Sequence, residues 1–238
     1  MEIVTYVDNL WILIAGILVM FMQPGFMLVE TGFTRSKNSV NIVMKNFMDF
    51  SVGALTYWAF GFAFAYGGST LGGFIAYGNF FLEGDSSTYF FQVVFAATAA
   101  TIVSGSVAER TKFSSYLLFQ PFICGLIYPI VTHWVWSGQG WLTDIGFVDF
   151  AGSGVVHMVG GFAALAGIQV VGPRIGKFDS NGKPLPIPGS SMVAAALGVF
   201  ILWFGWYGFN VGSALAAVDV DLAAIAVTTT LSASAASV

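Results

Sequence analysis

Long apolar runs, separated by short polar segments, dominate the chain. If the runs are helices, they span about 10–32, 42–66, 89–108, 113–136, 150–172 and 192–215, with an incomplete seventh at 222–238. A helix needs roughly 20 residues to cross a hydrocarbon core about 30 Å thick. We therefore expect an all-α polytopic membrane protein, with residues 1–238 forming a single transmembrane domain.

Prolines and charged residues inside the runs predict local departures from straight, apolar helices. Pro24 should kink the first helix, and Pro121 and Pro129 should kink the fourth, because proline lacks an amide donor and its ring displaces the preceding turn. Lys45 and Asp49 are four residues apart in the second helix, and we expect them to pair at the membrane interface.

Basic and acidic residues alternate from loop to loop. The basic residues lie in or beside the loops after the first, third and fifth helices: Arg35, Lys37, Lys45, Arg110, Lys112, Arg174, Lys177 and Lys183. The other loops carry acids: Glu83, Asp85, Asp144, Asp149, Asp219 and Asp221. Because cytoplasmic loops are enriched in Lys and Arg, we expect the N-terminus outside and the basic loops in the cytoplasm.

Composition excludes a soluble domain and several classes of chemistry. Hydrophobic residues make up 57% of the chain and charged residues 8%, whereas soluble domains have about 25% charged residues. The net charge of −4 argues against a nucleic-acid partner. The one cysteine, Cys124, lies in an apolar run and is expected to be a buried small side chain. With two histidines and no phosphate loop or serine-nucleophile motif, we expect no metal, no cofactor and no enzymatic activity.

A titratable histidine stands inside the fifth run. The segment from Asp149 to His157 reads Asp-Phe-Ala-Gly-Ser-Gly-Val-Val-His. A histidine within a span usually faces a protein interior or a pore, so His157 is either a pore residue or a core histidine bonded to a neighbouring helix. Asp149 is expected to cap the helix. The two positions are about 12 Å apart along a helix, which disfavours a catalytic dyad. The other histidine, His133, is expected to have a structural role at the outer end of the fourth helix.

Aromatic residues share faces on two other helices. Phe91 and Phe95 are one turn apart on the third helix. A second shared face, on the sixth helix, consists of Trp206, Phe209 and Ser213. Such stripes also fit ordinary core packing, as the abundant glycine and alanine fit close helix packing. Trp136, at the end of the fourth helix, belongs either to an interfacial aromatic belt or to a surface that attracts a cation by about 2 kcal/mol.

Five segments taken together resemble the ammonium transporter (Amt/Mep/Rh) family. In chain order they are Gly32-Phe-Thr-Arg-Ser-Lys-Asn38, Val107-Ala-Glu-Arg110, His133-Trp-Val-Trp136, Asp149-Phe-Ala-Gly-Ser-Gly-Val-Val-His157 and Trp206-Tyr-Gly-Phe-Asn-Val-Gly-Ser213. They extend over nearly the whole chain. The resemblance implies an ammonium-transporter-like helical bundle of eleven helices with the N-terminus outside. In that fold the first five helices are related to the next five by an inverted repeat.

The resemblance also implies roles for individual residues. Phe91, Trp136 and Ser213 would form an outer ammonium vestibule, and a phenyl gate would consist of Phe95 and Phe209. His157 would be the first of two pore histidines. Asp149 would be a buried acid beside the binding site. Asp149 and Trp206 would both have structural or electrostatic roles. Captured ammonium would lose a proton, because bare charge cannot cross an apolar conduit cheaply, and ammonia would pass the pore histidine.

Compared with the family, the chain is expected to be truncated in the second repeat. Helices eight to eleven, the second histidine and the cytoplasmic tail would lie outside it. The resemblance implies a homotrimer in the cell (plasma or inner) membrane, in contact with lipid, with ammonium or ammonia as ligand. A cytoplasmic regulator or fused signalling domain would lie beyond the chain. The alternative function is an ammonium sensor module of a membrane signalling protein. A third possibility, an intramembrane enzyme using His157 and Asp149, lacks an evident nucleophile or metal.

Overall fold

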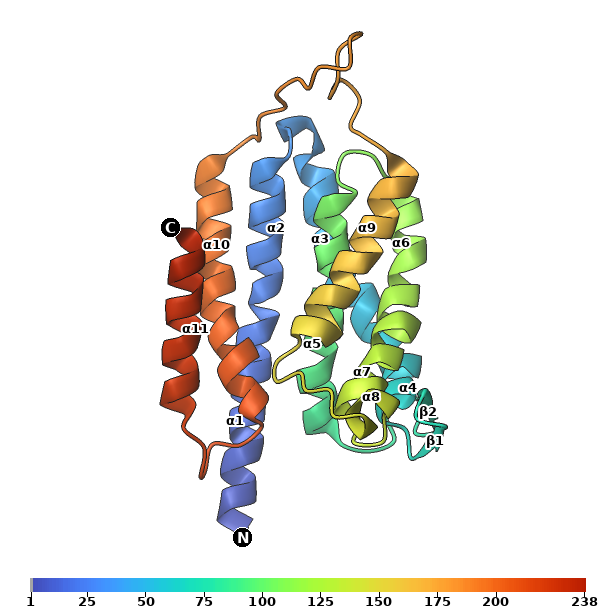
Figure 1. Ribbon diagram of the computed structural model, residues 1–238, viewed down its shortest axis with the longest axis vertical. Coiled ribbons are helices and arrows are strands. Elements are labelled where there is room, and N and C mark those ends of the chain that lie inside the picture. The colour runs from blue at the N-terminus through green and yellow to red at the C-terminus, as the bar shows by residue number, and fades with distance from the viewer. Residues whose placement is uncertain (1) are drawn as a thin grey trace.

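Helices make up almost all the regular structure in the computed structural model, which describes residues 2–238 (Figure 1). The α-helices are α1 (Glu2–Met20), α2 (Met22–Phe33), α3 (Ser39–Thr56), α4 (Phe62–Tyr66), α5 (Ser86–Ser106), α6 (Phe113–Phe122), α7 (Tyr128–Trp136), α8 (Trp141–Asp144), α9 (Val159–Val171), α10 (Met192–Trp206) and α11 (Leu222–Ser237). Two short strands, β1 (Ser69–Leu71) and β2 (Ile75–Tyr77), form an antiparallel hairpin in which Thr70 is opposite Ala76.

Among residues 2–238, four π-helical turns widen the helices locally. They are η2 (Tyr57–Gly61), η3 (Ile123–Ile127), η4 (Ser153–Met158) and η5 (Tyr207–Val211). Two 3₁₀ turns complete the helical elements: η1 (Ser36–Asn38) and η6 (Gly212–Ala214). Each π turn adjoins an α-helix directly: η2 joins α3 to α4, η3 joins α6 to α7, η4 leads into α9, and η5 extends α10. Because π turns are rare and frequently occur at functional sites, they indicate local constraints on these helices.

Five helical stretches of the described residues are long and apolar enough to cross a membrane. They are Glu2–Phe33, Ser86–Ser106, Phe113–Asp144, Ser153–Val171 and Met192–Ala214. The helix expected at 42–66 runs from Ser39 to Tyr66, but Lys45, Asn46 and Asp49 lower its apolar content and it is not one of the five. The helix expected at 222–238 is α11, which is apolar but shorter. The long helices run side by side between two ends of the bundle (Figure 1).

Prolines alter two of the long helical stretches. The first breaks at Phe21, ahead of Pro24 rather than at it, because a proline ring clashes with the carbonyl four residues earlier. In the stretch from α6 to α7, Pro121 lies inside α6 and Pro129 in the first turn of α7. The π turn η3 lies between these two prolines. The prolines therefore produce a break in the first helical stretch and a widened π turn in the stretch from α6 to α7.

Helix α5 forms the centre of the bundle. Every residue from Phe91 to Thr101 is buried, and α5 contacts α1, α2, α3 and α9. Small residues allow α2 and α10 to approach closely. A Cβ added at Gly198 of α10 would lie 2.7 Å from both the Gly25 carbonyl oxygen and the Val29 amide nitrogen of α2. This is the close packing that small residues permit between helices in lipid.

The three basic loops meet at one end of the bundle around Glu109 (Figure 1). The Glu109 side chain is fully buried; its Oε1 accepts hydrogen bonds from Arg35 Nε at 2.8 Å and Asn38 Nδ2 at 2.6 Å. Arg174 Nη1 lies 3.1 Å from Glu109 Oε2. Desolvation acts to raise the pKa of Glu109, but the bonds from Arg35 and Asn38 and the Arg174 charge outweigh it and keep the pKa below its ordinary value. We call these four residues the Glu109 clamp.

The prediction that Lys45 and Asp49 pair at the membrane interface is wrong. Both side chains are buried inside the bundle. Lys45 Nζ donates to the Ser104 carbonyl oxygen at 3.1 Å, and Asp49 Oδ1 accepts from the Tyr116 hydroxyl at 2.5 Å. Within residues 2–238 the two form no direct ion pair with each other. Their spacing of four residues places both on the side of α3 that packs against α5 and α6.

Candidate functional site

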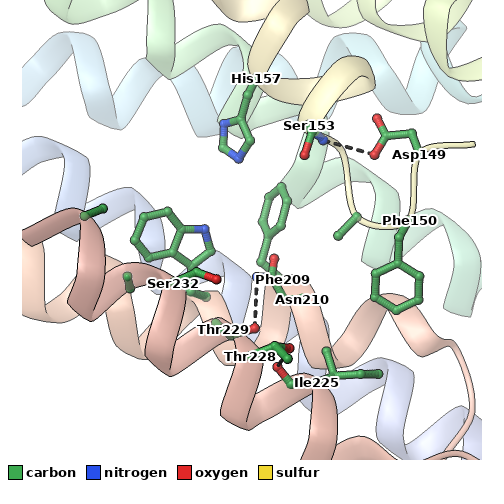
Figure 2. A pocket seen from close by; sticks show the side chains of 14 residues that line it. Asp149, Phe150, Ser153, His157, Phe209, Asn210, Ile225, Thr228, Thr229 and Ser232 are labelled. Atoms are coloured by element: carbon green, nitrogen blue, oxygen red, sulfur yellow. Dashed lines mark hydrogen bonds between the residues drawn. The ribbon is translucent and has the colours of Figure 1, made fainter.

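Two neighbouring cavities lie beside the start of η4. The Trp136 cavity has a volume of about 460 Å³, and its lining includes Tyr66, Thr88, Phe91, Gln92, Trp136 and Ser213. The His157 cavity, shown in Figure 2, has a volume of about 520 Å³, and its lining includes His157, Trp206, Phe209, Asn210, Thr229 and Ser232. Asp149 and Phe150 line both cavities, so the two are adjacent.

A series of aromatic rings connects the two cavities. Phe95 of α5 and Phe209 of η5 are both buried, and their rings stack with centroids 4.1 Å apart and planes inclined by 27°. Phe91, which lines the Trp136 cavity, contacts the Phe95 ring at 4.6 Å. His157, which lines the other cavity, stacks on Phe209 at 5.4 Å. The Phe95–Phe209 pair therefore lies between Phe91 on one side and His157 on the other.

Hydrogen bonds orient the two polar groups of the Trp136 cavity. The indole Nε1 of Trp136 donates to the Asp149 carbonyl oxygen at 2.7 Å, which fixes the orientation of the ring. Ser213 Oγ donates its proton to the Phe209 carbonyl oxygen at 2.7 Å. Since a serine hydroxyl has one proton and two lone pairs, the oxygen of Ser213 can only accept further bonds. An indole face and a hydroxyl acceptor together suit a small cation that carries N–H donors.

Asp149 is tied to the backbone at the start of η4. Its Oδ1 accepts from the amides of Gly152 at 2.7 Å and Ser153 at 3.0 Å. Its Oδ2 accepts from the amides of Gly154 at 2.7 Å and Val155 at 2.8 Å. Asp149 therefore caps this helix as expected, but the helix begins at Ser153 rather than at 150. The side chain is half-buried rather than buried, and its oxygens are occupied by backbone amides.

Gly152 makes this capping geometry possible. Its φ of 106° is in the left-handed region, which side chains with a Cβ rarely adopt. A Cβ at this position would also lie 2.7 Å from Val156 Cγ2 and 3.2 Å from the Trp136 ring. A glycine is therefore required both for the turn into η4 and for the approach of Trp136.

The two histidines occupy different environments. The His157 ring lies on η4, stacked on Phe209, and within residues 2–238 its ring nitrogens make no hydrogen bond. The His133 ring is buried, with Nδ1 2.9 Å from the Ala65 carbonyl oxygen and Nε2 2.8 Å from Thr70 Oγ1. His133 thus ties α7 to α4 and to the β-hairpin, away from both cavities. Of the two, only His157 is placed to meet a ligand in the cavities described here.

The helix face expected to combine Trp206, Phe209 and Ser213 is divided between the cavities. Trp206 and Phe209 line the His157 cavity, whereas Ser213 lines the Trp136 cavity. The π turn η5 lies between Trp206 and Ser213 and changes the angular spacing that an α-helix would give. The structure thus places Trp206 and Ser213 at different cavities, with Phe209 in the ring series between them.

The sequence interpretation missed the contribution of α11 to the site. Thr228, Thr229 and Ser232 of α11 line the His157 cavity together with Asn210 of η5 (Figure 2). Asn210 Nδ2 donates to Thr229 Oγ1 at 3.1 Å. The run of three threonines followed by serines in this helix was the available signal, because hydroxyl side chains within spans often mark contacts between helices.

One further carboxylate, Asp85, contacts a residue that lines the Trp136 cavity. Asp85 caps α5 by accepting from the amides of Ser87 at 2.9 Å and Thr88 at 3.2 Å, and Thr88 lines the cavity. Burial acts to raise the pKa of Asp85, but bonds from the Thr88 hydroxyl and these amides hold the pKa below its usual value. Asp85 is therefore ionised at neutral pH and contributes negative potential that attracts cations.

Comparison with known proteins identifies relatives along almost the whole chain. The model of the Ammonium Transporter Family matches residues 10–238. Ammonium transporter Amt2 of Archaeoglobus fulgidus is 50% identical over 248 residues, which cover 98% of this chain and 53% of the relative. Ammonium transporter 1 member 3 of Solanum lycopersicum is 44% identical, with 87% of this chain and 48% of the relative covered. The chain thus spans about half the length of these curated relatives.

Solved structures show the same arrangement of helices. A structure described as "Sensor Amt Protein" superposes with a TM-score of 0.90 at 41% identity and covers 94% of this chain and 58% of its own. The crystal structure of Candida albicans Mep2 superposes with a TM-score of 0.80 at 30% identity and covers 89% of this chain and 49% of its own.

Proposed function

Because the chain belongs to the ammonium transporter family, we propose that it contributes to ammonium transport across a membrane. The Trp136 cavity is the capture site, and the His157 cavity receives ammonia. The family is one of transporters by name, and the curated relatives described above are named ammonium transporters. An enzyme using Asp149 is disfavoured, because four backbone amides occupy its carboxylate oxygens.

The arrangement of Trp136, Ser213 and the stacked phenyl rings supports this proposal most strongly. Ammonium carries four N–H donors, so a hydroxyl that can only accept and an indole face are matched to it. A cation over an indole is stabilised by about 2 kcal/mol when water is excluded. Phe95 and Phe209 then present an apolar barrier that is costly for an ion and far less so for neutral ammonia.

Deprotonation of ammonium breaks one N–H bond and leaves ammonia and a proton. The oxygens of Asp149 already accept four backbone bonds, so we assign it a structural and electrostatic role. Trp206, which lines the His157 cavity, has a similar supporting role. The proton leaves ammonium in the Trp136 cavity and crosses the ring pair separately from ammonia to the imidazole of His157, whose nitrogens make no hydrogen bond within the described residues and can accept it. Ammonia passes between the phenyl rings and reaches His157.

The distribution of charge supports an orientation in the membrane. The loops that carry Arg35, Arg110 and Arg174 meet at one end, and α1 begins at the other end (Figure 1). By the positive-inside rule, we place the basic end in the cytoplasm and the N-terminus outside, with the cell membrane as the location. We also propose a homotrimer on the basis of the family, which native mass spectrometry of the protein in lipid would test.

Currents on a solid-supported membrane after an ammonium jump test the proposal. The protein is made from the intact gene that encodes this chain and is reconstituted in lipid. We expect Trp136→Leu to raise the half-saturating ammonium concentration roughly thirtyfold, the equivalent of about 2 kcal/mol. His157→Ala should reduce the current with little change in half-saturation. Trp134→Leu is the matched control, because Trp134 donates to the Phe74 carbonyl oxygen and lines neither cavity.

Binding measured in parallel separates transport from sensing. A wild-type current that weakens in both site variants supports transport along the proposed path. Saturable ammonium binding that requires Trp136, without any current, would identify a sensor instead, as the description of one solved relative suggests for that protein. Equal effects of the Trp136 and Trp134 substitutions would contradict the capture site.

A further inference from the structure

A second group of buried polar residues lies away from both cavities. Glu30, Lys45 and Asp49 are each more than nine-tenths buried, and none of them lines either cavity. Ser104 Oγ donates to Glu30 Oε2 at 2.8 Å, while its carbonyl oxygen accepts from Lys45 Nζ. With Tyr116, which bonds to Asp49, these residues form what we call the Glu30 cluster. The cluster connects α2, α3, α5 and α6.

The cluster has more acids than bases. If Glu30, Lys45 and Asp49 were all ionised, two negative charges would face one positive charge. Neither carboxylate has an ion-pair partner within the described residues. Glu30 Oε1 and Asp49 Oδ2 are also buried without any hydrogen-bond partner. A buried carboxylate without compensation is so unfavourable that it takes up a proton instead.

The contacts of Asp49 indicate that it is the ionised acid. The Tyr116 hydroxyl donates to Asp49 Oδ1, and a hydrogen bond donated to a carboxylate favours its charged form. Lys45 is one turn away on α3, and its Nζ lies 4.8 Å from the centre of the Tyr116 ring. Lys45 and Asp49 thus share Tyr116 as a neighbour, while the Lys45 charge acts on both Asp49 and Glu30.

Glu30 lacks comparable support for a negative charge. It lies in the last turn of α2, which ends at Phe33, where the helix dipole disfavours an anion. Its hydrogen-bonding partners are neutral: the Ser104 hydroxyl, which donates to Oε2, and the Asn46 side chain as a weaker partner. The surrounding helices bring no additional cation near it. Helix α10 carries no titratable residue, and those of α1 (Glu2, Tyr6 and Asp8) lie in its first turns. Arg110, from the loop after α5, donates instead to the carbonyl oxygens of Gly172 and Ser106.

From this geometry we propose that Glu30 is a proton-binding site that remains protonated at neutral pH, while Lys45 and Asp49 stay ionised. The bound proton makes the cluster neutral and allows Glu30 to pack against α5. The site lies outside the path proposed for ammonium, so it does not depend on that function. It places an exchangeable proton towards the basic end of the bundle, on α2, five residues before Arg35 of the Glu109 clamp.

Infrared spectroscopy of the full chain in lipid, with carbon-13 in the side-chain carboxyl of glutamate, tests this proposal. The chain has four glutamates, Glu2, Glu30, Glu83 and Glu109. Glu2 and Glu83 are exposed, and Glu109 is ion-paired. We expect one labelled band from the C=O stretch of a protonated carboxylic acid at neutral pH. The band should disappear in Glu30→Gln and persist in the matched control Glu109→Gln.

Titration of the labelled wild-type protein provides a second measurement that does not depend on folding of the variant. The labelled acid band should persist at neutral pH and vanish in alkali as Glu30 ionises. Absence of a protonated glutamate at neutral pH, or a band that remains in Glu30→Gln, would overturn the proposal. A protonated band that appears only with labelled aspartate would assign the proton to Asp49 and would overturn it equally.

Discussion

Replacement of Asp149 separates its role in the architecture from its role as a charge. Its carboxylate accepts four backbone amides, from Gly152 to Val155, at 2.7–3.0 Å. Asp149→Ala removes all four bonds and frees the amides at the start of η4. Asp149→Asn retains one carbonyl oxygen, so it preserves two of the bonds at most, and its amide group faces two backbone donors. Both variants remove the charge.

The free energy of unfolding that the Asp149 variants are expected to lose lies between two limits. An ordinary helix cap contributes about 1 kcal/mol, whereas hydrogen bonds to charged groups contribute about 1.5–3 kcal/mol each. Asp149 is half-buried, so water can satisfy some of the amides freed in the variant. We therefore expect Asp149→Ala to lower the free energy of unfolding by about 3 kcal/mol, and Asp149→Asn by about half as much.

Reversible unfolding in mixed micelles measures this loss, and ammonium-dependent current measures its effect on the site. Asp144→Ala is the matched control, because Asp144 is an exposed acid that ends α8, five residues before Asp149. The current should fall further in Asp149→Ala than in Asp149→Asn, since Trp136 is bonded to the Asp149 carbonyl oxygen and shifts with this turn. If both variants unfold like the wild type yet lose current equally, the architectural role is refuted and the charge alone matters.

Three further substitutions address the clamp, the capture site and helix packing. Glu109→Gln should cost about 1–2 kcal/mol in unfolding free energy, because each partly exposed ion pair contributes at most about 1 kcal/mol. Since the folded pKa of Glu109 is below its ordinary value, the wild-type contribution is complete above about pH 4.3 and is lost as the pH falls through the folded value. Acid unfolding curves of the two proteins should therefore converge at low pH, and curves that stay parallel would contradict this. Ser213→Ala should weaken ammonium binding by about tenfold, as expected for one hydrogen bond from a charged donor; an unchanged titration of the current would exclude Ser213 from the site. Gly198→Val should destabilise the α2–α10 contact by more than about 2 kcal/mol through overpacking, whereas Gly161→Ala, which meets no atom within 4 Å, should unfold like the wild type.

The positions of the helices could be predicted from the apolar runs, because the lipid and the protein core both favour apolar side chains. The pairing of Phe91 with Phe95 could be predicted, since both lie one turn apart on an ordinary α-helix. The capping role of Asp149 could also be predicted, because an aspartate just before an apolar run commonly caps the start of a helix. These features depend on residues close together in the chain.

Features that depend on residues distant in the chain, or on irregular backbone, could not be predicted from the sequence. Lys45 and Asp49 were expected at the interface because their spacing shows that they share a face but not which face is buried. The π turn η5 separates Trp206 from Ser213, and no side-chain pattern in its sequence distinguishes it from an α-helical turn. The contact between Asn210 and Thr229 likewise requires knowledge of where α11 packs.

Single-residue insertions and deletions inside a helix normally rotate everything that follows by about 100°. A π turn is a place where one additional residue is already accommodated without breaking the helix. Deleting one residue from η5 could restore an α-helical turn and would then swing Ser213 away from the Trp136 cavity with every side chain of the site still present. The number of residues in η4 and η5 therefore determines which side chains face the two cavities, and a change in that number alone would redirect them.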